Sequence, residues 1–235
     1  MEKTESYHKK RFVSWSGGKE SCLACYKAMQ DDFVVSYLLN FMDKDGERSR
    51  AHGLRIELLR LQSDAIGIPI ILKPTTWETY EQVFKNTVSE LKQIGVEEGI
   101  FGDIDLQEHR DWVERVCAEV GIKPILPLWS KKRERVLEEF IRAGFEAIVV
   151  ATKADFLGEE WLGCRVDRKF RRELSNKQID LCGEAGEYHT FVIDGPIFRK
   201  RINILESAKV LRNGRWFLEI TKLELDDKGL RGTKR

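Results

Sequence analysis

The sequence predicts an α/β protein with a doubly wound, mostly parallel sheet and a smaller C-terminal α+β unit. Three observations support this prediction. Short apolar stretches alternate with segments of helical periodicity, a glycine-rich turn follows the first apolar stretch, and the alternation stops after about residue 155. Strand–helix alternation of this length is typical of a parallel sheet that helices cover on both faces.

The first predicted strand is RFVSW (11–15), and the segment after the turn has apolar residues at positions that suit a helix. A second strand (33–42) is apolar enough to be buried on both faces. A polar loop (44–53) leads into a helix over 54–67, which ends on a glycine, a common helix stop. Further strands are predicted at 69–75, 99–104, 124–129 and 146–154, and further helices at 76–95, 106–121 and 131–145.

The change of character near residue 155 predicts two units. We expect the parallel-sheet domain to cover 1–154 and the smaller domain to cover 155–225, with a flexible tail at 226–235. In the smaller unit, 156–190 has few regular runs, and Asn213-Gly214 lies between two strand-like runs, which is typical of a tight β-hairpin.

The composition narrows the class of protein. Of the residues, 42% are hydrophobic and 34% are charged, which predicts a buried core rather than disorder. The formal net charge of +1 argues against a main task of gripping nucleic acid or an acidic membrane. No apolar run approaches a membrane span, and the polar N-terminus lacks a signal-peptide core. The five cysteines are an odd number and are spread along the chain, so they do not indicate a disulfide framework. We therefore expect reduced thiols and a cytoplasmic protein.

The turn SGGKES (16–21) between the first strand and its helix predicts an anion site. The start of a helix exposes unpaired N–H groups, and glycines let the backbone approach a phosphate closely. Lys19 adds a cation, and Ser16 and Ser21 add hydroxyl donors. The alternative is an ordinary turn with a solvated lysine. The turn matches neither the G-x-x-x-x-G-K-S/T loop nor the G-x-G-x-x-G loop.

SGGKES resembles the SGGKDS loop of the PP-loop (N-type) ATP pyrophosphatases, with Glu20 in place of their aspartate. The resemblance implies the adenine nucleotide alpha hydrolase-like (HUP type) fold. It also implies that ATP is split between its α- and β-phosphates while the loop holds the departing pyrophosphate. Charge that grows on the β-phosphate would be stabilised by backbone donors, lysine and Mg²⁺.

A second stretch, CGEAGEYHTFVIDGPIF (182–198), has two glutamates three residues apart, followed by a histidine. It resembles the E-G-G-E-F/Y-H/E-T signature of the diphthine–ammonia ligase family, with Ala185 in place of a glycine; a purely structural turn is the alternative. FGDIDLQEHRDWVERVC (101–117) and AHGLRIELLRLQSDAIGIPI (51–70) are also similar to that family. The resemblance covers about residues 11–205.

The resemblance implies a ligase that adenylates the carboxylate of diphthine, a modified histidine of elongation factor 2. Ammonia then displaces AMP to form an amide. ATP, Mg²⁺, ammonium and elongation factor 2 are the implied cofactors and partners, without a membrane or a stable nucleic-acid partner, and a homodimer is left open. Three alternatives remain: the same chemistry on another small-molecule or protein carboxylate, a tRNA sulfurtransferase, and a nucleotide sensor without turnover.

The resemblance also assigns site residues. Nucleotide binding falls to Ser16, Gly17, Gly18, Lys19, Glu20, Ser21, Gly102 and Asp103. Catalysis falls to Lys19, Glu184, Glu187 and His189, and substrate binding to Arg110, Trp161, Gly183, Gly186 and Thr190.

Several of these residues have two interpretations. Asp103 is either a Mg²⁺ contact or a helix N-cap. Glu184 and Glu187 either hold Mg²⁺ or attract ammonium and take its proton, and His189 is either a base or a hydrogen-bonding residue of the loop. Arg110 either grips an acid of the substrate or forms a surface salt bridge.

Five side chains have an apolar or surface role as the alternative to a functional one. Trp129 and Trp161 are either core residues or binding platforms, and His52 is either a surface residue or a contact to adenine or phosphate. Cys22 and Cys25 are predicted to be buried small apolar residues, because two cysteines cannot complete a four-ligand metal site.

Overall fold

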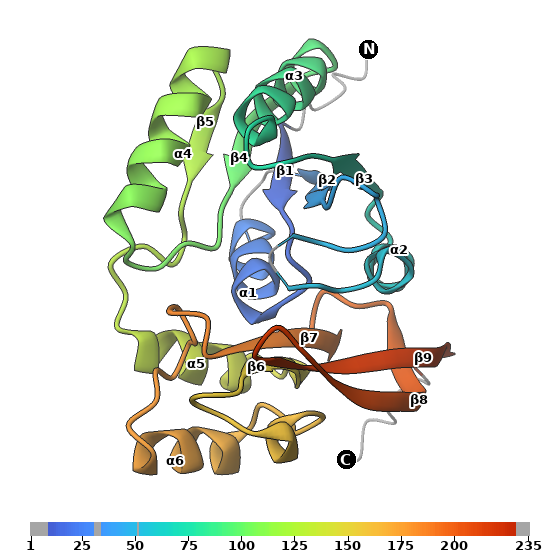
Figure 1. The fold of residues 1–235 in the computed structure, drawn as a ribbon. Helices are drawn as coiled ribbons and strands as arrows, with labels where there is room; N and C mark the ends of the chain where they lie inside the picture. Colours follow the sequence, from blue (N-terminus) through green and yellow to red (C-terminus); the bar gives the residue numbers. More distant parts are fainter. Residues whose placement is uncertain (1–8, 31–33, 51, 229–235) are drawn as a thin grey trace, which may run out of the picture.

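The computed structural model describes residues 9–30, 34–50 and 52–228, which form two sheets (Figure 1). The first sheet has five parallel strands in the order β3-β2-β1-β4-β5. The second is antiparallel with the order β7-β6-β9-β8. The predicted fold class, a doubly wound parallel sheet with a smaller α+β unit, is therefore confirmed.

The first unit alternates strands with helices from β1 to β5. Its strands are β1 (Lys10–Ser14), β2 (Val34–Met42), β3 (Ile70–Pro74), β4 (Val96–Ile100) and β5 (Lys123–Ile125). Its helices are α1 (Lys19–Ala28), α2 (Ile56–Ile66), α3 (Tyr80–Gln93) and α4 (Gln107–Val120). As predicted, α2 ends at Gly67, which has φ +78°, a left-handed conformation that glycine adopts without strain.

Helices cover both faces of this sheet because successive side chains of each strand point to opposite sides. Phe12 and Leu39 pack against Phe84 of α3. Val13, next to Phe12 on β1, belongs instead to the cluster that contains the buried residues of α1 and α2. This division places α3 and α4 on one face and α1 and α2 on the other.

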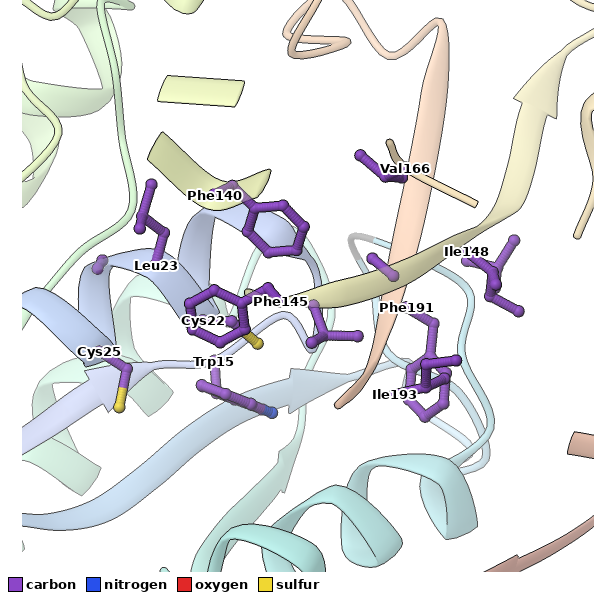
Figure 2. Packing of buried hydrophobic residues seen from close by; sticks show 14 of the residues in the cluster. Trp15, Cys22, Leu23, Cys25, Phe140, Phe145, Ile148, Val166, Phe191 and Ile193 are labelled. Atoms are coloured by element: carbon purple, nitrogen blue, oxygen red, sulfur yellow. The ribbon is translucent and has the colours of Figure 1, made fainter. Parts of the chain in front are cut away.

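The second unit shares a hydrophobic core with the first. Its elements are α5 (Arg133–Arg142), β6 (Glu146–Lys153), a 3₁₀ turn (Glu159–Trp161), α6 (Arg168–Asn176), β7 (Tyr188–Asp194), β8 (Lys200–Arg212) and β9 (Arg215–Asp227). Figure 2 shows Leu23 of α1 near Phe140 of α5 and Cys22 near Phe145, and Phe191 and Ile193 of β7 belong to the same cluster. Helix α1 thus lies between the two units, and its first turn is held from both sides (Figure 1).

The placement of the strand at 146–154 in the parallel sheet was wrong. Strand β6 pairs antiparallel with β7 and β9 in the second sheet. Its apolar sequence fits a buried strand in either sheet, so the pattern alone did not decide between them. Because β6 belongs to the second sheet, we propose that the boundary between the units lies ahead of α5 rather than after residue 154.

Two further differences concern the C-terminal third. Helix α6 lies within the segment predicted to have few regular runs, and Asp167 caps it by accepting a hydrogen bond from the Phe170 N–H. Strand β9 continues to Asp227, so residues 226 and 227 are not part of a tail, and residues 229–235 lie outside the described residues.

The predicted hairpin turn at Asn213-Gly214 is confirmed, because it joins β8 to β9.

Within the residues that the structure describes, no helix combines the length and the apolar character that crossing a membrane would require.

Candidate active site

A cavity of about 660 Å³ opens at the carboxyl edge of the first sheet. It is lined by residues 14–16, 39–41 and 101–103, which lie at or just beyond the ends of β1, β2 and β4. Strand β1 lies between β2 and β4, so the connections leave it in opposite directions. Ligands of open α/β sheets bind at such a switch point, and the cavity is therefore the candidate active site.

The lining has two chemically different parts. Ring-to-ring contacts join the aromatic residues of what we call the aromatic wall, which are Phe41, Tyr80, Phe84, Phe101 and Trp112. Hydroxyl, carboxyl and imidazole groups make up what we call the polar wall, which comprises Ser16, Glu20, Ser21, Asp103, His109 and Glu184. A ligand with a flat apolar ring and a charged portion would match both walls.

The first turn of α1 belongs to the polar wall. Gly18 has no side chain to cap this helix, and the Gly18 and Lys19 N–H groups donate to Ser16 Oγ and Thr190 Oγ1. The N–H groups of Glu20 and Ser21 follow in the first turn, where amides lack an intrahelical partner. The Ser16 hydroxyl lies 3.1 Å from the Ser21 hydroxyl and accepts a hydrogen bond from the Gly18 N–H. The partial positive charge and the two hydroxyls suit an anion.

The two glycines of the turn do not line the cavity; they allow the turn to pack closely against neighbouring residues. Gly17 has φ +78°, and its carbonyl accepts hydrogen bonds from the Gln62 side chain and the Val192 N–H. A Cβ on Gly18 would lie 2.4 Å from Cε1 of His52, closer than atoms can approach. Strand β7 and helix α2 therefore fix the turn from behind, and larger residues would not fit.

Lys19 is buried beneath the turn and does not line the cavity. Its Nζ donates a hydrogen bond to the Cys182 carbonyl at 2.6 Å and pairs with Glu20 Oε1 at 2.8 Å. Burial lowers the pKa of Lys19, but Glu20, Tyr188 and Cys182 together outweigh that effect and raise the pKa above its usual range. The lysine therefore remains a fixed positive charge between the turn and the 182–190 segment.

Glu184 is the member of the glutamate–histidine signature that reaches the cavity. Burial, and then the nearby Glu20 carboxylate, raise its pKa to about 7. Its backbone N–H donates to Asp180, which is also paired with Arg133 at 2.6 Å. Arg133 in turn pairs with Asp105, beyond β4, so this ion-pair chain ties Glu184 to the first sheet.

Asp103 does not cap α4, whose N-cap is Leu106 and has no side-chain cap. Its carboxylate lies 3.2 Å from Nδ1 of His109, and this contact raises the pKa of His109. Gly102, which was predicted to contact the nucleotide, lines the cavity and lies against the turn: a Cβ there would be 3.0 Å from the backbone of Glu20. The end of β4 thus supports the polar wall directly.

The oxygen ligands in the cavity fit Mg²⁺ only when phosphates complete its shell. Among the described residues, no group of three or more histidines, cysteines or carboxylates is arranged to hold a metal. Asp103 and Glu184 nevertheless contribute carboxylates to the lining. Mg²⁺ is commonly bound by one or two carboxylates together with substrate phosphates, which is the arrangement that these residues permit.

The remaining signature residues support the turn from outside the cavity. Thr190 Oγ1 accepts a hydrogen bond from the Lys19 N–H, and Gly183 and Gly186 have positive φ angles in the turn before β7. Glu187 is buried, and His189 stacks on His52 with ring centroids 4.6 Å apart; neither lines the cavity. Substrate and catalytic roles for these five residues remain predictions without a cavity contact to support them.

Arg110 and Trp161 also lie outside the lining. Arg110 forms an ion pair with Glu114 at 2.6 Å and lies over the ring of Trp129, which matches the surface interpretation. Trp161 is buried in the core against Phe170, and Cys22 and Cys25 are buried in that same cluster. Burial raises the pKa of both thiols, which agrees with an apolar role.

His52 was predicted to be either a surface residue or a ligand contact; it is partly buried, lines the cavity and contacts the Thr190 carbonyl through Nδ1. Other lining residues gave no signal in the sequence. Asn40 lies inside the apolar run of β2, where a single amide gives no signal of its own. The aromatic wall was also missed, because its residues come from β2, α3, α4 and the position after β4, and they converge only in the fold.

The stacked histidines predict an acid-sensitive stability. Burial lowers the pKa of His52 to about 4 from its ordinary 6.5, and burial and His52 lower that of His189 well below 6.5. Their stabilising contribution is therefore complete above pH 6.5 and is lost as pH falls from there toward 4. We expect the free energy of unfolding to fall by at most about 1.4 kcal/mol per pH unit for each histidine.

Urea unfolding between pH 7 and pH 5 measures this effect. The double variant His52→Gln, His189→Gln should show a flatter pH dependence than the unmodified chain. His109→Gln is the matched control, because the raised pKa of His109 gives its contribution the opposite sign. Equal slopes in the double variant and the unmodified chain would contradict the prediction.

Comparison with known proteins gives matches over most of the chain. Residues 9–124 match the sequence model of the Diphthamide synthase N-terminal domain, and residues 132–225 match that of the Diphthamide synthase C-terminal domain. Diphthine–ammonia ligase from Bos taurus is 34% identical, with 91% of this chain and 91% of the relative covered. The Danio rerio protein of that name is 28% identical, with 91% and 95% covered.

A solved structure, titled as a predicted subunit of tRNA methyltransferase from Methanocaldococcus jannaschii, has a TM-score of 0.44 and 13% identity. It covers 80% of this chain and 97% of the other, and the likeness is too weak to argue from.

Proposed function

The chain belongs to the diphthamide synthase family, and we propose that it is the ATP-dependent ligase that joins ammonia to the carboxylate of diphthine. The observation that carries this function is the meeting of two features in one cavity. The uncapped start of α1 offers an anion site, and Glu184 offers a carboxyl group with a pKa of about 7. The first suits the phosphates of ATP, and the second suits proton removal from ammonium at neutral pH.

In the first step, we propose that ATP lies with its phosphates on the polar wall. The β- and γ-phosphates contact the first amides of α1 and the hydroxyls of Ser16 and Ser21. A diphthine carboxylate oxygen attacks the α-phosphorus, the bond from that phosphorus to the bridging oxygen breaks, and pyrophosphate leaves. The fixed positive charge of Lys19 and the helix start favour the charge that grows on the leaving group.

In the second step, ammonium gives a proton to Glu184 and the resulting ammonia attacks the acyl carbon of the adenylate. The bond between that carbon and the AMP oxygen then breaks, and the attacking nitrogen loses a second proton to water, which yields the amide and AMP. A carboxyl group with a pKa of about 7 is a suitable base at neutral pH, because it is ionised in about half of the molecules at pH 7. Mg²⁺ held by Asp103 and the phosphates would neutralise phosphate charge.

We also propose that the substrate is the diphthine side chain of elongation factor 2 and that the protein acts in the cytoplasm, where translation takes place. The family of the chain and its similarity to relatives named diphthine–ammonia ligase support this proposal. The aromatic wall leaves an apolar surface for a base, while the polar wall leaves charged groups for the reacting centre.

The products of the reaction test the proposed function. The protein is incubated with Mg²⁺, ATP, ammonium and elongation factor 2 that carries diphthine. AMP and pyrophosphate should form in equal amounts, and only when all components are present. ADP and phosphate as products would contradict the proposal. Turnover with elongation factor 2 that bears an unmodified histidine, or with a small carboxylic acid alone, would contradict the proposed substrate.

A further inference from the structure

The side-chain amide nitrogen of Asn40 is hydrogen-bonded, whereas the amide oxygen has no hydrogen-bond partner among the described residues. It lies near the end of β2, is only 5% exposed and lines the cavity. Its Nδ2 donates a hydrogen bond to the Trp15 carbonyl at 2.7 Å. Because a carbonyl can only accept, the amide nitrogen must face Trp15, and the amide oxygen must face elsewhere.

The Oδ1 atom of Asn40 is buried and has no hydrogen-bond partner among the described residues. A buried carbonyl oxygen without a donor is costly, and such atoms in folded proteins call for an explanation. Because Asn40 lines the cavity, a ligand with an N–H or O–H group would satisfy this oxygen.

The surroundings of Asn40 limit what that ligand group is. The cavity that Asn40 lines is also lined by the aromatic wall. Leu39 and Phe41, its neighbours on β2, point to the opposite face of the strand, where they pack into the cluster that includes Phe84 and Phe101. The aromatic wall therefore gives the cavity an apolar surface that suits an aromatic base and does not suit a phosphate. The phosphate donors lie at the start of α1, which packs against Gly102 at the end of β4, on the other side of β1.

We propose that Asn40 Oδ1 accepts a hydrogen bond from the 6-amino group of adenine and makes the site selective for ATP. This inference rests on the proposed function, in which the cavity binds ATP. Adenine carries an amino donor at its 6-position, whereas guanine and hypoxanthine carry an oxygen acceptor there. When the 6-oxygen of guanine or hypoxanthine faces Asn40 Oδ1, neither oxygen has a hydrogen-bond donor. Nucleotides with these bases therefore bind more weakly than ATP.

Nucleotide binding to the full chain tests the inference by a double-mutant cycle. Dissociation constants are measured calorimetrically for ATP and for purine riboside triphosphate, which lacks the 6-amino group. They are measured for the unmodified chain and for Asn40→Ala. The unmodified chain should bind ATP about three- to tenfold more tightly than the deaminated analogue, which is the factor that one neutral hydrogen bond supplies. Asn40→Ala should bind the two nucleotides equally.

The cycle separates this effect from damage to the turn. Loss of the Trp15 contact in Asn40→Ala weakens both nucleotides alike and cancels in the ratio. An unchanged ATP-to-analogue ratio in the variant would overturn the inference. The inference would also be overturned by a cycle with 2′-deoxy-ATP or 3′-deoxy-ATP in which Asn40→Ala abolishes the preference for the ribose hydroxyl rather than the preference for the 6-amino group.

The unmodified chain alone provides a second test if Asn40→Ala does not fold. ITP, which has an oxygen at the 6-position, should bind more weakly than both ATP and the deaminated analogue. Equal affinity for ATP and ITP would overturn the inference while leaving the proposed function intact. Absence of ATP binding to the unmodified chain would instead overturn the proposed function, and this inference with it.

Discussion

Replacement of Lys19 by methionine is expected to slow pyrophosphate release from ATP by about a hundredfold or more, which is typical when one group that stabilises developing charge is removed. Lys19 is buried, and its ammonium group contacts Glu20 and the Cys182 carbonyl directly beneath the first turn of α1. Methionine keeps the length and the apolar stem of the side chain but loses the charge. The measurement is the rate of pyrophosphate formation with saturating substrate and ammonium.

The matched control is Lys27→Met on the same helix. Lys27 pairs with Glu139 at 2.6 Å outside the cavity, so its loss should leave the rate unchanged. In Lys19→Met, the Glu20 carboxylate loses its ion-pair partner, and this could itself slow the reaction. The double variant Lys19→Met, Glu20→Gln removes the unpaired Glu20 charge as well, and its rate of pyrophosphate formation should remain low. Recovery of the rate in the double variant would contradict a direct role for Lys19.

Replacement of Glu184 by glutamine is expected to lower the amidation rate at pH 7.5 by about a hundredfold or more, as removal of a general base does. The pKa of Glu184 is raised to about 7, first by burial and then by Glu20. The carboxylate form therefore accumulates as pH rises through 7. For the unmodified chain, kcat/KM for total ammonium should rise through pH 7 and level off above it.

The pH profile of Glu184→Gln distinguishes a base from a structural residue. Without the carboxylate, the enzyme depends on free ammonia in solution, whose share keeps increasing with pH over the neutral and mildly alkaline range. The profile of the variant should therefore rise without levelling off. Glu187→Gln is the comparison: Glu187 is buried and does not line the cavity, so the inflection near pH 7 should persist. An inflection lost in Glu187→Gln and kept in Glu184→Gln would contradict the assignment.

The local parts of this architecture were predictable because they depend on short segments. The alternation of strands and helices, the turn at 16–21 and the hairpin at Asn213-Gly214 each rest on neighbouring residues. The same is true of the stop of α2 at Gly67. The turn and the carboxyl ends of the strands also indicated where the cavity would lie.

The parts that the sequence did not predict depend on distant contacts. The run at 146–153 is apolar enough for either sheet, and its partners β7 and β9 lie far along the chain. Helix α6 has a strongly charged sequence, KFRREL, in which Phe170 and Leu174 are the buried positions. Asn40 gave no signal within an apolar strand, and its importance comes from the Trp15 carbonyl on β1's extension and the cavity beyond.

The signature loop shows how a pattern can locate a site without assigning its residues. Glu184 and Glu187 are equivalent in the sequence, but only Glu184 is turned toward the cavity, where Asp180 and Arg133 hold its backbone. Likewise Thr190 and Lys19 support the turn from behind rather than through the lining. Backbone geometry and packing decided these roles, and neither can be read from residue spacing.

The most direct test of the account is a crystal structure of this protein with Mg²⁺ and an ATP analogue that cannot be cleaved between its α- and β-phosphates. We expect the two outer phosphates to contact the first amides of α1 beside Ser16 and Ser21, with the α-phosphorus open toward Glu184. A nucleotide bound elsewhere, or one bound in the cavity with its outer phosphates turned away from residues 16–21, would contradict the account.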